Sequence, residues 1–442
     1  MSLLIKNATI VTMNPDREVI HGNIYIEQDR LVEIGETRET AEEIIDASGR
    51  VVIPGLIQPH IHLCQTLFRG QADDLELLDW LRLRIWPLEG AHDEESIRTS
   101  ALLGLGELIK GGTTAIVDME TVHHTDAAIQ AITESGIRAL TGKAMMDYGD
   151  DVPDTLKETT DSSLKESVEL LEKWHGYNDG LVQYVFAPRF VVSCTEELLK
   201  EVGHLAKQYG VKIHTHASEN KGECELVMQR HGMRNVIYLE HIGLTGPDLI
   251  LAHCIWLDDR EMKIITESGT KVVYCPSSNT KLASGIARIP EMLEKKGNVS
   301  IAADGAPCNN NLDGWLEMRL AALLQKPQHG PTVMPAEKVF ELATIGGARA
   351  MGLEDEIGSI EVGKKADLAI VDLNRLHALP ASNTNIYSRL VYEARADDVR
   401  TTIVNGRVLM RDRELLTIDE EEVKRQAEQD IIRVARRAGL IA

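Results

Sequence analysis

Aromatic side chains, long apolar runs and closely spaced cysteine pairs are all scarce in this sequence. Phe, Trp and Tyr make up only 4% of the 442 residues, so the core must be mostly aliphatic. No apolar run approaches the roughly 20 residues that a membrane-spanning helix needs, so we expect no membrane partner. Residues 1–13 also lack the basic and then apolar pattern of a secretory signal.

Basic residues are too few to balance the acidic ones. There are 47 Lys and Arg against 69 Asp and Glu, which gives a net charge of -22. Such a surface repels phosphate backbones and anionic lipids, which argues against a nucleic-acid partner. The six cysteines are scattered without a CxxC pair, as expected for reduced thiols in a cytoplasmic protein.

The two ends of the chain have the same character. Residues 3–12, 22–27 and 30–35 near the start, and 366–373 and 401–410 near the end, are short β-branched or alternating runs. Asn405-Gly406 is a strong hairpin-turn signal. The sequence therefore predicts that 1–52 and 360–415 join into one small β-sandwich domain.

The middle of the chain alternates apolar strands with amphipathic helices. Residues 93–110 are predicted to form a helix that Asp93 caps and Gly111-Gly112 ends, and 113–118 a buried strand. About eight such units span 53–359, which predicts an α/β fold, a (β/α)8 TIM-like barrel. A doubly wound sheet is the alternative, but its glycine-rich phosphate loop is missing. Residues 416–442 are predicted to form a solvated C-terminal helix.

Histidines occur where two of the predicted barrel strands end. The first strand ends in His60-Ile61-His62, and the fifth ends in His214-Thr215-His216. Residues i and i+2 of a strand point the same way, so His60 and His62 can bind one ion together. A catalytic zinc site takes three protein ligands and keeps one position open. Either His214 or His216 could be the third ligand.

Two further strand ends carry side chains of the same chemistry. The sixth strand ends at His253, and the eighth ends at Asp304. Active sites of this barrel lie at the C-terminal ends of its strands. The sequence therefore predicts one site that contains both imidazoles and carboxylates.

The combined motifs resemble the amidohydrolase superfamily, in its aminohydrolase and chlorohydrolase branch. That branch includes the 5'-deoxyadenosine, S-adenosylhomocysteine and methylthioadenosine deaminases, guanine deaminase and the triazine hydrolases. The resemblance covers nearly the whole chain. It rests on the stretches 51–70 (VVIPGLIQPHIHLCQTLFRG), 211–219 (VKIHTHASE), 249–257 (LILAHCIWL), 272–279 (VVYCPSSN), 301–311 (IAADGAPCNNN), 343–353, 358–373 and 404–410.

This resemblance implies one divalent metal ion with four protein ligands. The implied ligands are His60, His62, His216 and Asp304, and the expected ion is Zn2+, with Fe2+ and Mn2+ as alternatives. Binuclear members bridge two metals with a lysine at the end of the fourth strand. Residues 181–189 (LVQYVFAPR) contain no lysine, so one metal is expected.

The same resemblance assigns catalytic roles to three side chains. Glu219 would protonate the heteroaromatic ring, His253 would orient the attacking water, and Asp304 would accept its proton. His214 would take a supporting or structural role. The implied reaction is hydrolytic deamination of an amino-substituted ring.

Four residues are candidates for substrate binding: Arg189, Trp86, His123 and Asn279. Guanine deaminase has an arginine in the region of Arg189, whereas adenosine-type deaminases often have a histidine there. The stretches 118–126 and 187–199 favour a 5'-modified adenosine as the small-molecule substrate. A guanine, oxopurine or pterin, a triazine, and a catalytically inactive metal-binding scaffold are the alternatives. The sequence leaves open whether the chain forms a homo-oligomer.

Overall fold

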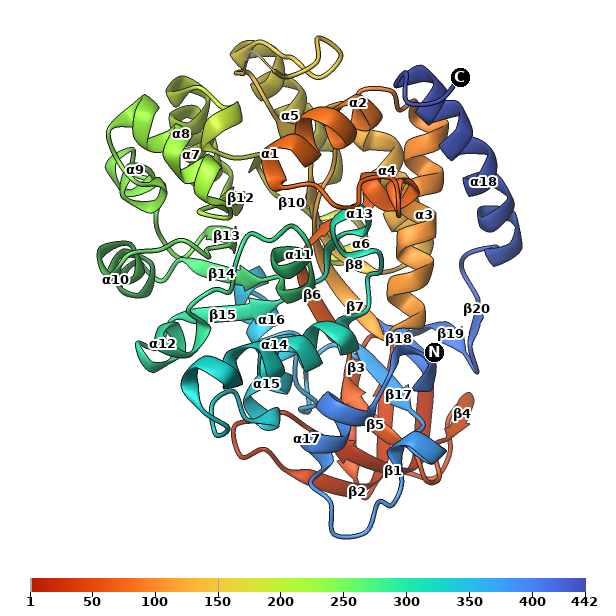
Figure 1. Ribbon diagram of the computed structural model, residues 1–442. Coiled ribbons are helices and arrows are strands. Elements are labelled where there is room, and N and C mark those ends of the chain that lie inside the picture. Colours follow the sequence, from red (N-terminus) through yellow and green to blue (C-terminus); the bar gives the residue numbers. More distant parts are fainter. Residues whose placement is uncertain (1, 150) are drawn as a thin grey trace.

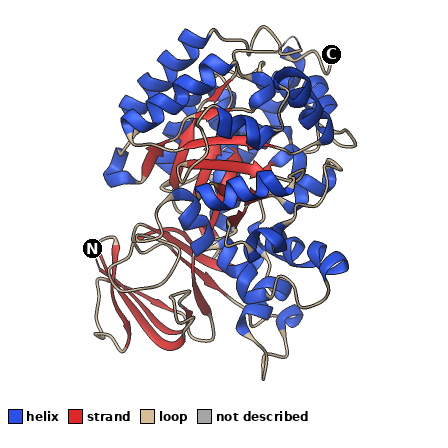
Figure 2. Ribbon diagram, turned by 90° about the vertical axis from the view of Figure 1, so that its left-hand side faces the viewer, coloured by secondary structure: helices blue, strands red, loops and turns tan. Residues whose placement is uncertain are grey.

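The computed structural model describes residues 2–149 and 151–442. A barrel of alternating strands and helices occupies one part of the molecule, and a separate β-sheet lies beneath it (Figure 1). The helices surround the barrel strands on the outside (Figure 2). This is the α/β architecture that the sequence predicted, a barrel with a small sheet domain built from both chain ends.

The separate sheet contains strands from both ends of the chain. Its hydrogen-bonded order is β20-β19-β18-β17-β5-β1-β2-β3, and β4 pairs with β1. The strands are β1 (Ser2–Val11), β2 (Val19–Glu27), β3 (Arg30–Gly35), β4 (Glu43–Asp46), β5 (Val51–Pro54), β17 (Leu368–Val371), β18 (Val399–Val404), β19 (Arg407–Arg411) and β20 (Glu414–Leu415). The junction is the antiparallel pairing of β17 with β5.

The hairpin turn predicted at Asn405-Gly406 is confirmed. It joins β18 to β19, which pair in antiparallel orientation. Asn405 has a φ of 53° and Gly406 a φ of 75°. Two successive positive φ angles define the turn whose twist matches a two-residue hairpin, and Asn and Gly tolerate this conformation best.

The barrel strands pair in parallel around a closed ring. They are β6 (Leu56–His62), β7 (Thr113–Met119), β8 (Arg138–Gly142), β9 (Ala144–Met145), β10 (Val182–Tyr184), β11 (Ala187–Pro188), β12 (Ile213–Ala217), β13 (Leu249–His253), β14 (Lys271–Tyr274), β15 (Asn298–Ile301) and β16 (Asp304–Gly305). Residues of 298–305 pair with β14 on one side and with β6 on the other, which closes the ring. Single bridges such as Phe186 to Ile213 connect the fourth and fifth strands.

Helices follow most of the barrel strands. The longer ones are α3 (Glu94–Lys110), α4 (Thr125–Ser135), α5 (Thr160–Trp174), α7 (Glu196–Tyr209), α8 (Lys221–His231), α10 (Asp259–Ser268), α14 (Gly314–His329), α15 (Ala336–Ala343) and α18 (Glu420–Arg437). Shorter ones are α6 (Tyr177–Gly180), α9 (Asn235–His241), α11 (Pro276–Lys281), α12 (Ile289–Glu294), α13 (Ala306–Asn309), α16 (Ile345–Met351) and α17 (Ile386–Ser388). The predicted helix at 93–110 is confirmed: the Asp93 side chain accepts from the Ser96 backbone N–H at its start.

A short helical segment lies between β6 and α3. It comprises the turns η1 (Leu63–Phe68), α1 (Leu77–Trp80), η2 (Leu81–Ile85) and α2 (Trp86–Glu89). Its apolar side chains, among them Leu77, Trp80 and Leu81, are buried. Because the segment leaves β6 at its carboxyl end, it covers the end of the barrel where the strands terminate.

The C-terminal helix is less solvated than its sequence suggests. α18 runs along α3 (Figure 1), and Val434 and Ala435 on its inner face are buried. Its charged side chains pair with the start of α3, as Arg437 does with Asp93 at 2.5 Å. One face of the helix is therefore part of the packed protein.

Candidate metal centre and catalytic site

The histidines and the aspartate singled out in the sequence meet at the carboxyl end of the barrel. His60 and His62 lie on β6, and Asp304 begins β16 beside them. His60 Nε2 lies 3.2 Å from Asp304 Oδ1, and His62 Nε2 lies 3.4 Å from the same oxygen. His216, near the end of β12, completes the group, with its Nε2 3.2 Å from that of His62.

Hydrogen bonds at the outer ring nitrogens fix how two of these histidines are protonated. His62 Nδ1 lies 2.8 Å from the carbonyl oxygen of Met119, and His216 Nδ1 lies 2.7 Å from that of Arg189. A carbonyl oxygen only accepts, so Nδ1 must be the donor in both rings. In the neutral imidazole the Nε2 atom then carries a lone pair, and both lone pairs face the centre.

His214 supports His60 rather than facing the centre. Its Nδ1 donates to the carbonyl oxygen of Ile250 at 3.2 Å, so its Nε2 is an acceptor. That Nε2 lies 2.7 Å from Nδ1 of His60, which must therefore donate. His60 Nε2 is left as a buried lone pair without a hydrogen-bond partner among the described residues. Between His214 and His216, the structure places only His216 toward the centre.

This donor set fits a metal cation. Three ring lone pairs and the Asp304 carboxylate lie together, and such a group repels itself unless positive charge lies among them. A proton does not supply that charge near neutral pH, because burial and the neighbouring His60 lower the pKa of His62 to about 3. Imidazole nitrogens and a carboxylate oxygen are ligands that zinc accepts.

Other groupings of possible ligands overlap with this one. His60, His216 and His253 each place a ligand atom within 4.8 Å of the others, and so do His60, Cys275 and Asp304. Burial raises the pKa of the Cys275 thiol well above its usual range, which disfavours the thiolate form needed for coordination.

Glu219 and His253 form the opposite wall of the site. His253 Nε2 lies 3.5 Å from Glu219 Oε2 and 3.8 Å from Asp304 Oδ2. Burial raises the pKa of Glu219 to about 7. For His253, burial lowers the pKa, but the nearby carboxylates of Glu219 and Asp304 outweigh it and the net shift is upward.

The backbone adopts a rare conformation at this end of the barrel. His253 has a φ of 71° and Asp304 a φ of 67°, a left-handed region that L-residues with side chains seldom occupy. Such strain persists only where surrounding contacts enforce it, and it concentrates at functional sites. The Asp304 side chain is also held, because Ser278 Oγ donates to its Oδ2 at 2.6 Å.

Of the four predicted substrate-binding residues, only Arg189 lines the cavity that contains the catalytic side chains. Its guanidinium is buried and binds both oxygens of Glu89, at 2.6 and 3.1 Å. Gln65 Nε2 donates to the same Glu89 carboxylate at 2.8 Å. The sequence analysis missed both Glu89 and Gln65, because nothing in the local sequence of either reveals a buried partner.

The other three candidates lie elsewhere. Asn279 Oδ1 accepts from His253 Nδ1 at 2.9 Å, so Asn279 contacts a candidate catalytic residue and does not line the catalytic cavity. Trp86 lines a neighbouring cavity, whereas Trp80 lines the catalytic one. His123 lines neither of these two cavities. Ser278 was not singled out either, although it lies in the stretch 272–279 that carried the family resemblance.

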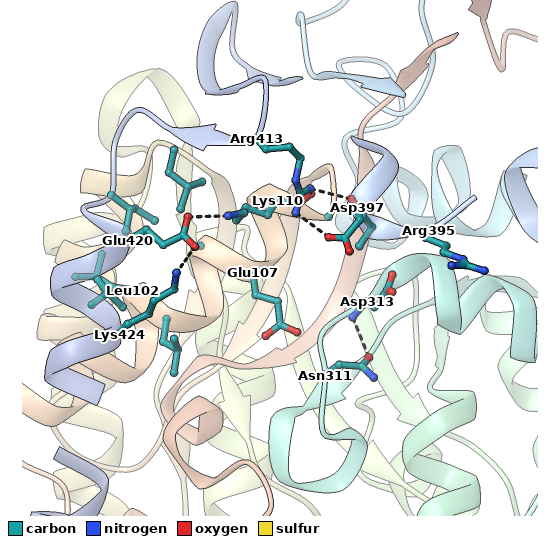
Figure 3. Close-up of a pocket in the computed structure, with 17 residues that line it drawn as sticks. Leu102, Glu107, Lys110, Asn311, Asp313, Arg395, Asp397, Arg413, Glu420 and Lys424 are labelled. Carbon is teal, nitrogen blue, oxygen red and sulfur yellow. Dashed lines mark hydrogen bonds and ion pairs between the residues drawn. The ribbon is translucent and has the colours of Figure 1, made fainter. Parts of the chain in front are cut away.

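A separate cavity of about 560 Å³ lies away from the strand ends, between α3, α18 and the loops at 311–313 and 395–397. The charged side chains that line it largely pair with one another, as Lys110 does with Glu420 at 2.7 Å and Arg413 with Asp397 at 3.1 Å (Figure 3). None of the predicted site residues lines it. We therefore place the functional site at the barrel end.

Comparison with known proteins finds relatives that match nearly the whole chain. The chain is 41% identical over 428 residues to a 5'-deoxyadenosine deaminase of Methanosarcina acetivorans, covering 96% of each protein. It is 42% identical to a 5-methylthioadenosine/S-adenosylhomocysteine deaminase of Thermococcus onnurineus, covering 94% of this chain and 95% of that protein. A crystal structure of an adenosine deaminase from Xanthomonas campestris with bound zinc superposes with a TM-score of 0.92, at 31% identity and 98% coverage of both chains.

The described part of the chain contains no helix long and apolar enough to cross a bilayer. The model of the amidohydrolase family matches residues 51–409, which include all the barrel strands and both histidine pairs. With relatives of about 40% identity over nearly its full length, the chain belongs to the amidohydrolase family.

Proposed function

We propose that this protein is a metal-dependent hydrolytic deaminase of 5'-modified adenosines, which releases ammonia and the corresponding inosine. The observation that carries the proposal is the cluster of three imidazole lone pairs, two of them beside Asp304 and the third, that of His216, beside His62, with the buried Glu219 opposite. The names of the relatives support the substrate class, because they act on 5'-deoxyadenosine, methylthioadenosine or S-adenosylhomocysteine.

We propose that His60, His62, His216 and Asp304 hold one divalent metal ion, and that this ion is Zn2+. When bound, zinc acts as a Lewis acid that makes a water molecule acidic near neutral pH. The residues of the chain prepare this site in advance. Met119, Arg189 and His214 orient the three rings, and such supporting contacts also raise the basicity of metal-binding histidines.

Glu219 is suited to protonate the substrate ring. A carboxyl group with a pKa of about 7 is partly protonated at neutral pH, so it can donate a proton and later accept one. Protonation of a ring nitrogen makes the adjacent carbon, which carries the amino group, more electrophilic. Glu223, whose carboxylate accepts the backbone N–H of Glu219 at 3.1 Å, holds this segment in place.

Asp304 and His253 are suited to handle the attacking water. In the proposed reaction a C–O bond forms at the amino-bearing carbon while one O–H proton of the water passes to Asp304. The C–N bond then breaks, and the amine leaves as ammonia after it receives a proton. His253 lies between the carboxylates of Glu219 and Asp304, which raise its pKa and so favour its protonated form, and in that form its Nε2–H can donate a hydrogen bond to the developing oxyanion.

We propose that Arg189 contributes to the substrate pocket through its pair with Glu89. Two terminal nitrogens of the guanidinium donate to the two oxygens of one carboxylate, and this paired hydrogen bonding holds the guanidinium in one orientation. Because both side chains are buried and Arg189 faces the cavity, the pair presents a fixed polar surface to the ring or the sugar.

Ammonia release from a panel of heterocycles tests this proposal. We expect turnover of 5'-deoxyadenosine, methylthioadenosine and S-adenosylhomocysteine by metal-loaded protein. Guanine, 8-oxoguanine, a pterin and melamine serve as competitors. Turnover of guanine or a triazine without any adenosine would overturn the substrate assignment. No hydrolysis of any compound would favour an inactive scaffold.

A further inference from the structure

A second, larger cavity adjoins the catalytic one. The catalytic cavity has a volume of only about 30 Å³, whereas the adjoining one measures about 730 Å³. We call the larger space the vestibule; its walls include Arg82, Trp86, Tyr148, Phe190, Leu226 and Arg230. Phe190 lines both spaces, and the helical segment at 76–86 contributes side chains to each. A substrate whose ring sits beside Glu219 therefore has the vestibule as adjacent room for the rest of the molecule.

The vestibule contains a cation that is held in place without a carboxylate partner. The guanidinium of Arg230 stacks over the ring of Tyr148, 3.6 Å from its centroid. Two of its N–H groups donate to backbone carbonyl oxygens, those of Val191 at 3.3 Å and Cys194 at 3.0 Å. Among the described residues it forms no ion pair. Arginine has five N–H donors, so several remain for an anionic ligand.

The indole N–H of Trp86, a residue that also lines the vestibule, has no hydrogen-bond partner among the described residues. The Trp86 side chain is 7% exposed. Buried N–H groups are nearly always hydrogen-bonded, so an orphaned one indicates a missing acceptor. The indole N–H calls only for an acceptor, which ordered water can supply, whereas the guanidinium of Arg230 calls for an anionic oxygen.

Acidic side chains lie on the wall formed by the helical segment. Asp79 pairs with Arg82 at 2.8 Å, and Glu76 lies one helical turn before Trp80. The vestibule therefore contains an unpaired cation as well as carboxylates, and its walls are partly apolar. This combination is complementary to a zwitterion on a short apolar linker.

We propose that the vestibule binds the 5'-substituent of the nucleoside and that Arg230 recognises a carboxylate there. This rests on the proposed function, because it assumes an adenosine ring beside Glu219. The ligand class is an adenine nucleoside with a 5'-thioether-linked amino acid, as in S-adenosylhomocysteine. Its carboxylate binds Arg230, and its ammonium group faces Glu76 and Asp79.

Substrate selectivity in arginine variants tests the assignment. We compare kcat/KM for S-adenosylhomocysteine, its decarboxylated thioether amine and 5'-deoxyadenosine. In Arg230→Gln the ratio of S-adenosylhomocysteine to 5'-deoxyadenosine activity falls roughly tenfold or more, the usual size for loss of a charge-assisted hydrogen bond. Arg230→Lys keeps the charge and restores part of that ratio. The decarboxylated amine shows no such dependence on Arg230.

A matched control removes an arginine far from the vestibule. Arg98 forms an exposed ion pair with Glu134 at 2.6 Å, and Arg98→Gln leaves the substrate ratio unchanged. Thermal unfolding of each variant shows whether the Arg230 changes disturb the fold around Val191 and Cys194.

Two outcomes separate this inference from the proposed function. Equal loss of activity on all three nucleosides in Arg230→Gln, with normal unfolding, overturns the vestibule assignment while the deaminase proposal stands. Absence of turnover with any adenosine by the wild-type protein overturns the deaminase proposal itself.

Discussion

Each histidine of the proposed metal centre has two ring nitrogens. The outer one makes a hydrogen bond within the protein, and the inner one faces the centre. The outer nitrogens of His62 and His216 donate to backbone carbonyls, which leaves the inner ones for a cation. The outer nitrogen of His60 donates to the His214 ring instead, and His214 in turn donates to the carbonyl oxygen of Ile250. The geometry therefore separates the proposed ligand, His216, from His214, the proposed supporting residue only two positions away.

Metal content should distinguish these two histidines. We expect His216→Ala to lose stoichiometric metal, since only two imidazole ligands and Asp304 remain. His214→Ala should keep a metal site with affinity lowered about 10–100-fold, the usual cost of losing a contact that orients a ligand. Elemental analysis after dialysis against graded chelator measures both, with the exposed His241→Ala as the control. Equal metal loss in the two variants, or two stoichiometric metals in the wild type, would contradict the proposed centre.

Glu219→Gln should separate proton transfer from metal binding. Glutamine keeps the size of the side chain but cannot donate and accept a proton at neutral pH, so kcat should fall about 10²–10⁴-fold. Metal content should stay unchanged, because Glu219 is not among the proposed ligands.

The pH profile checks the same group independently. Burial raises the pKa of Glu219 to about 7 from an ordinary value of 4.5, so the protonated acid is present below pH 7 and is lost above it. Wild-type kcat/KM should therefore decline as the pH rises through about 7, and Glu219→Gln should lack that decline. A wild-type profile that is flat across this range would argue against Glu219 as the proton donor.

Among the elements, the β18–β19 hairpin illustrates how the two chain ends are joined. Gly406 in its turn has a φ of 75°, and a Cβ added there would lie 2.0 Å from the carbonyl oxygen of Gln28. Gln28 belongs to the turn between β2 and β3, close to the other end of the chain. Gly406 therefore has two reasons to be glycine: its positive φ angle and its close approach to Gln28.

Two glycine-to-alanine variants can separate the effect of the positive φ angle from the effect of the steric clash. Gly210 has a φ of 68° at the end of α7, but a Cβ there meets nothing within 4 Å. Gly210→Ala should lower the free energy of unfolding by about 1–2 kcal/mol, the cost of a left-handed L-residue. Gly406→Ala should cost clearly more, because the added clash with Gln28 requires the backbone to shift. Denaturant unfolding compares them, and equal losses would show that the chain ends do not meet tightly.

Barrel and sheet are tied together by a buried ion pair. Arg138, at the start of β8, donates from Nε to Asp367 Oδ2 at 2.8 Å, and both side chains are almost fully buried. Asp367 also accepts the backbone N–H of Asn405 at 2.7 Å. The pair therefore connects a barrel strand, the strand β17 that follows Asp367, and the hairpin turn.

Breaking this pair from one side should destabilise the protein strongly. Arg138→Met leaves a buried carboxylate unpaired, which typically costs about 3–5 kcal/mol. The double variant with Asp367→Asn should lose less than the sum of the two single losses, because no unpaired charge remains. The exposed pair Arg98–Glu134 is the control, expected to contribute under about 1 kcal/mol. Additive losses at Arg138 and Asp367, measured by denaturant unfolding, would contradict this coupling.

Much of this architecture could be predicted from local sequence. Strand-ending His60, His62, His253 and Asp304 were recognisable because a parallel barrel brings all carboxyl strand ends together. The Asp93 cap and the Asn405-Gly406 turn were predictable because a few neighbouring residues determine each of them. The roles of the site residues remain predictions that the experiments above address.

Only the tertiary structure could decide which side chains meet across the barrel. His214 and His216 lie on the same face of one strand, so periodicity could not choose between them. Their contacts do: His214 meets the outer nitrogen of His60, whereas His216 places its Nε2 beside that of His62. Likewise Glu89 pairs with Arg189 across 100 residues, and Trp86 faces the vestibule while Trp80 faces the catalytic cavity. Sequence patterns define which face of an element is buried, whereas the partner on that face depends on how distant elements pack.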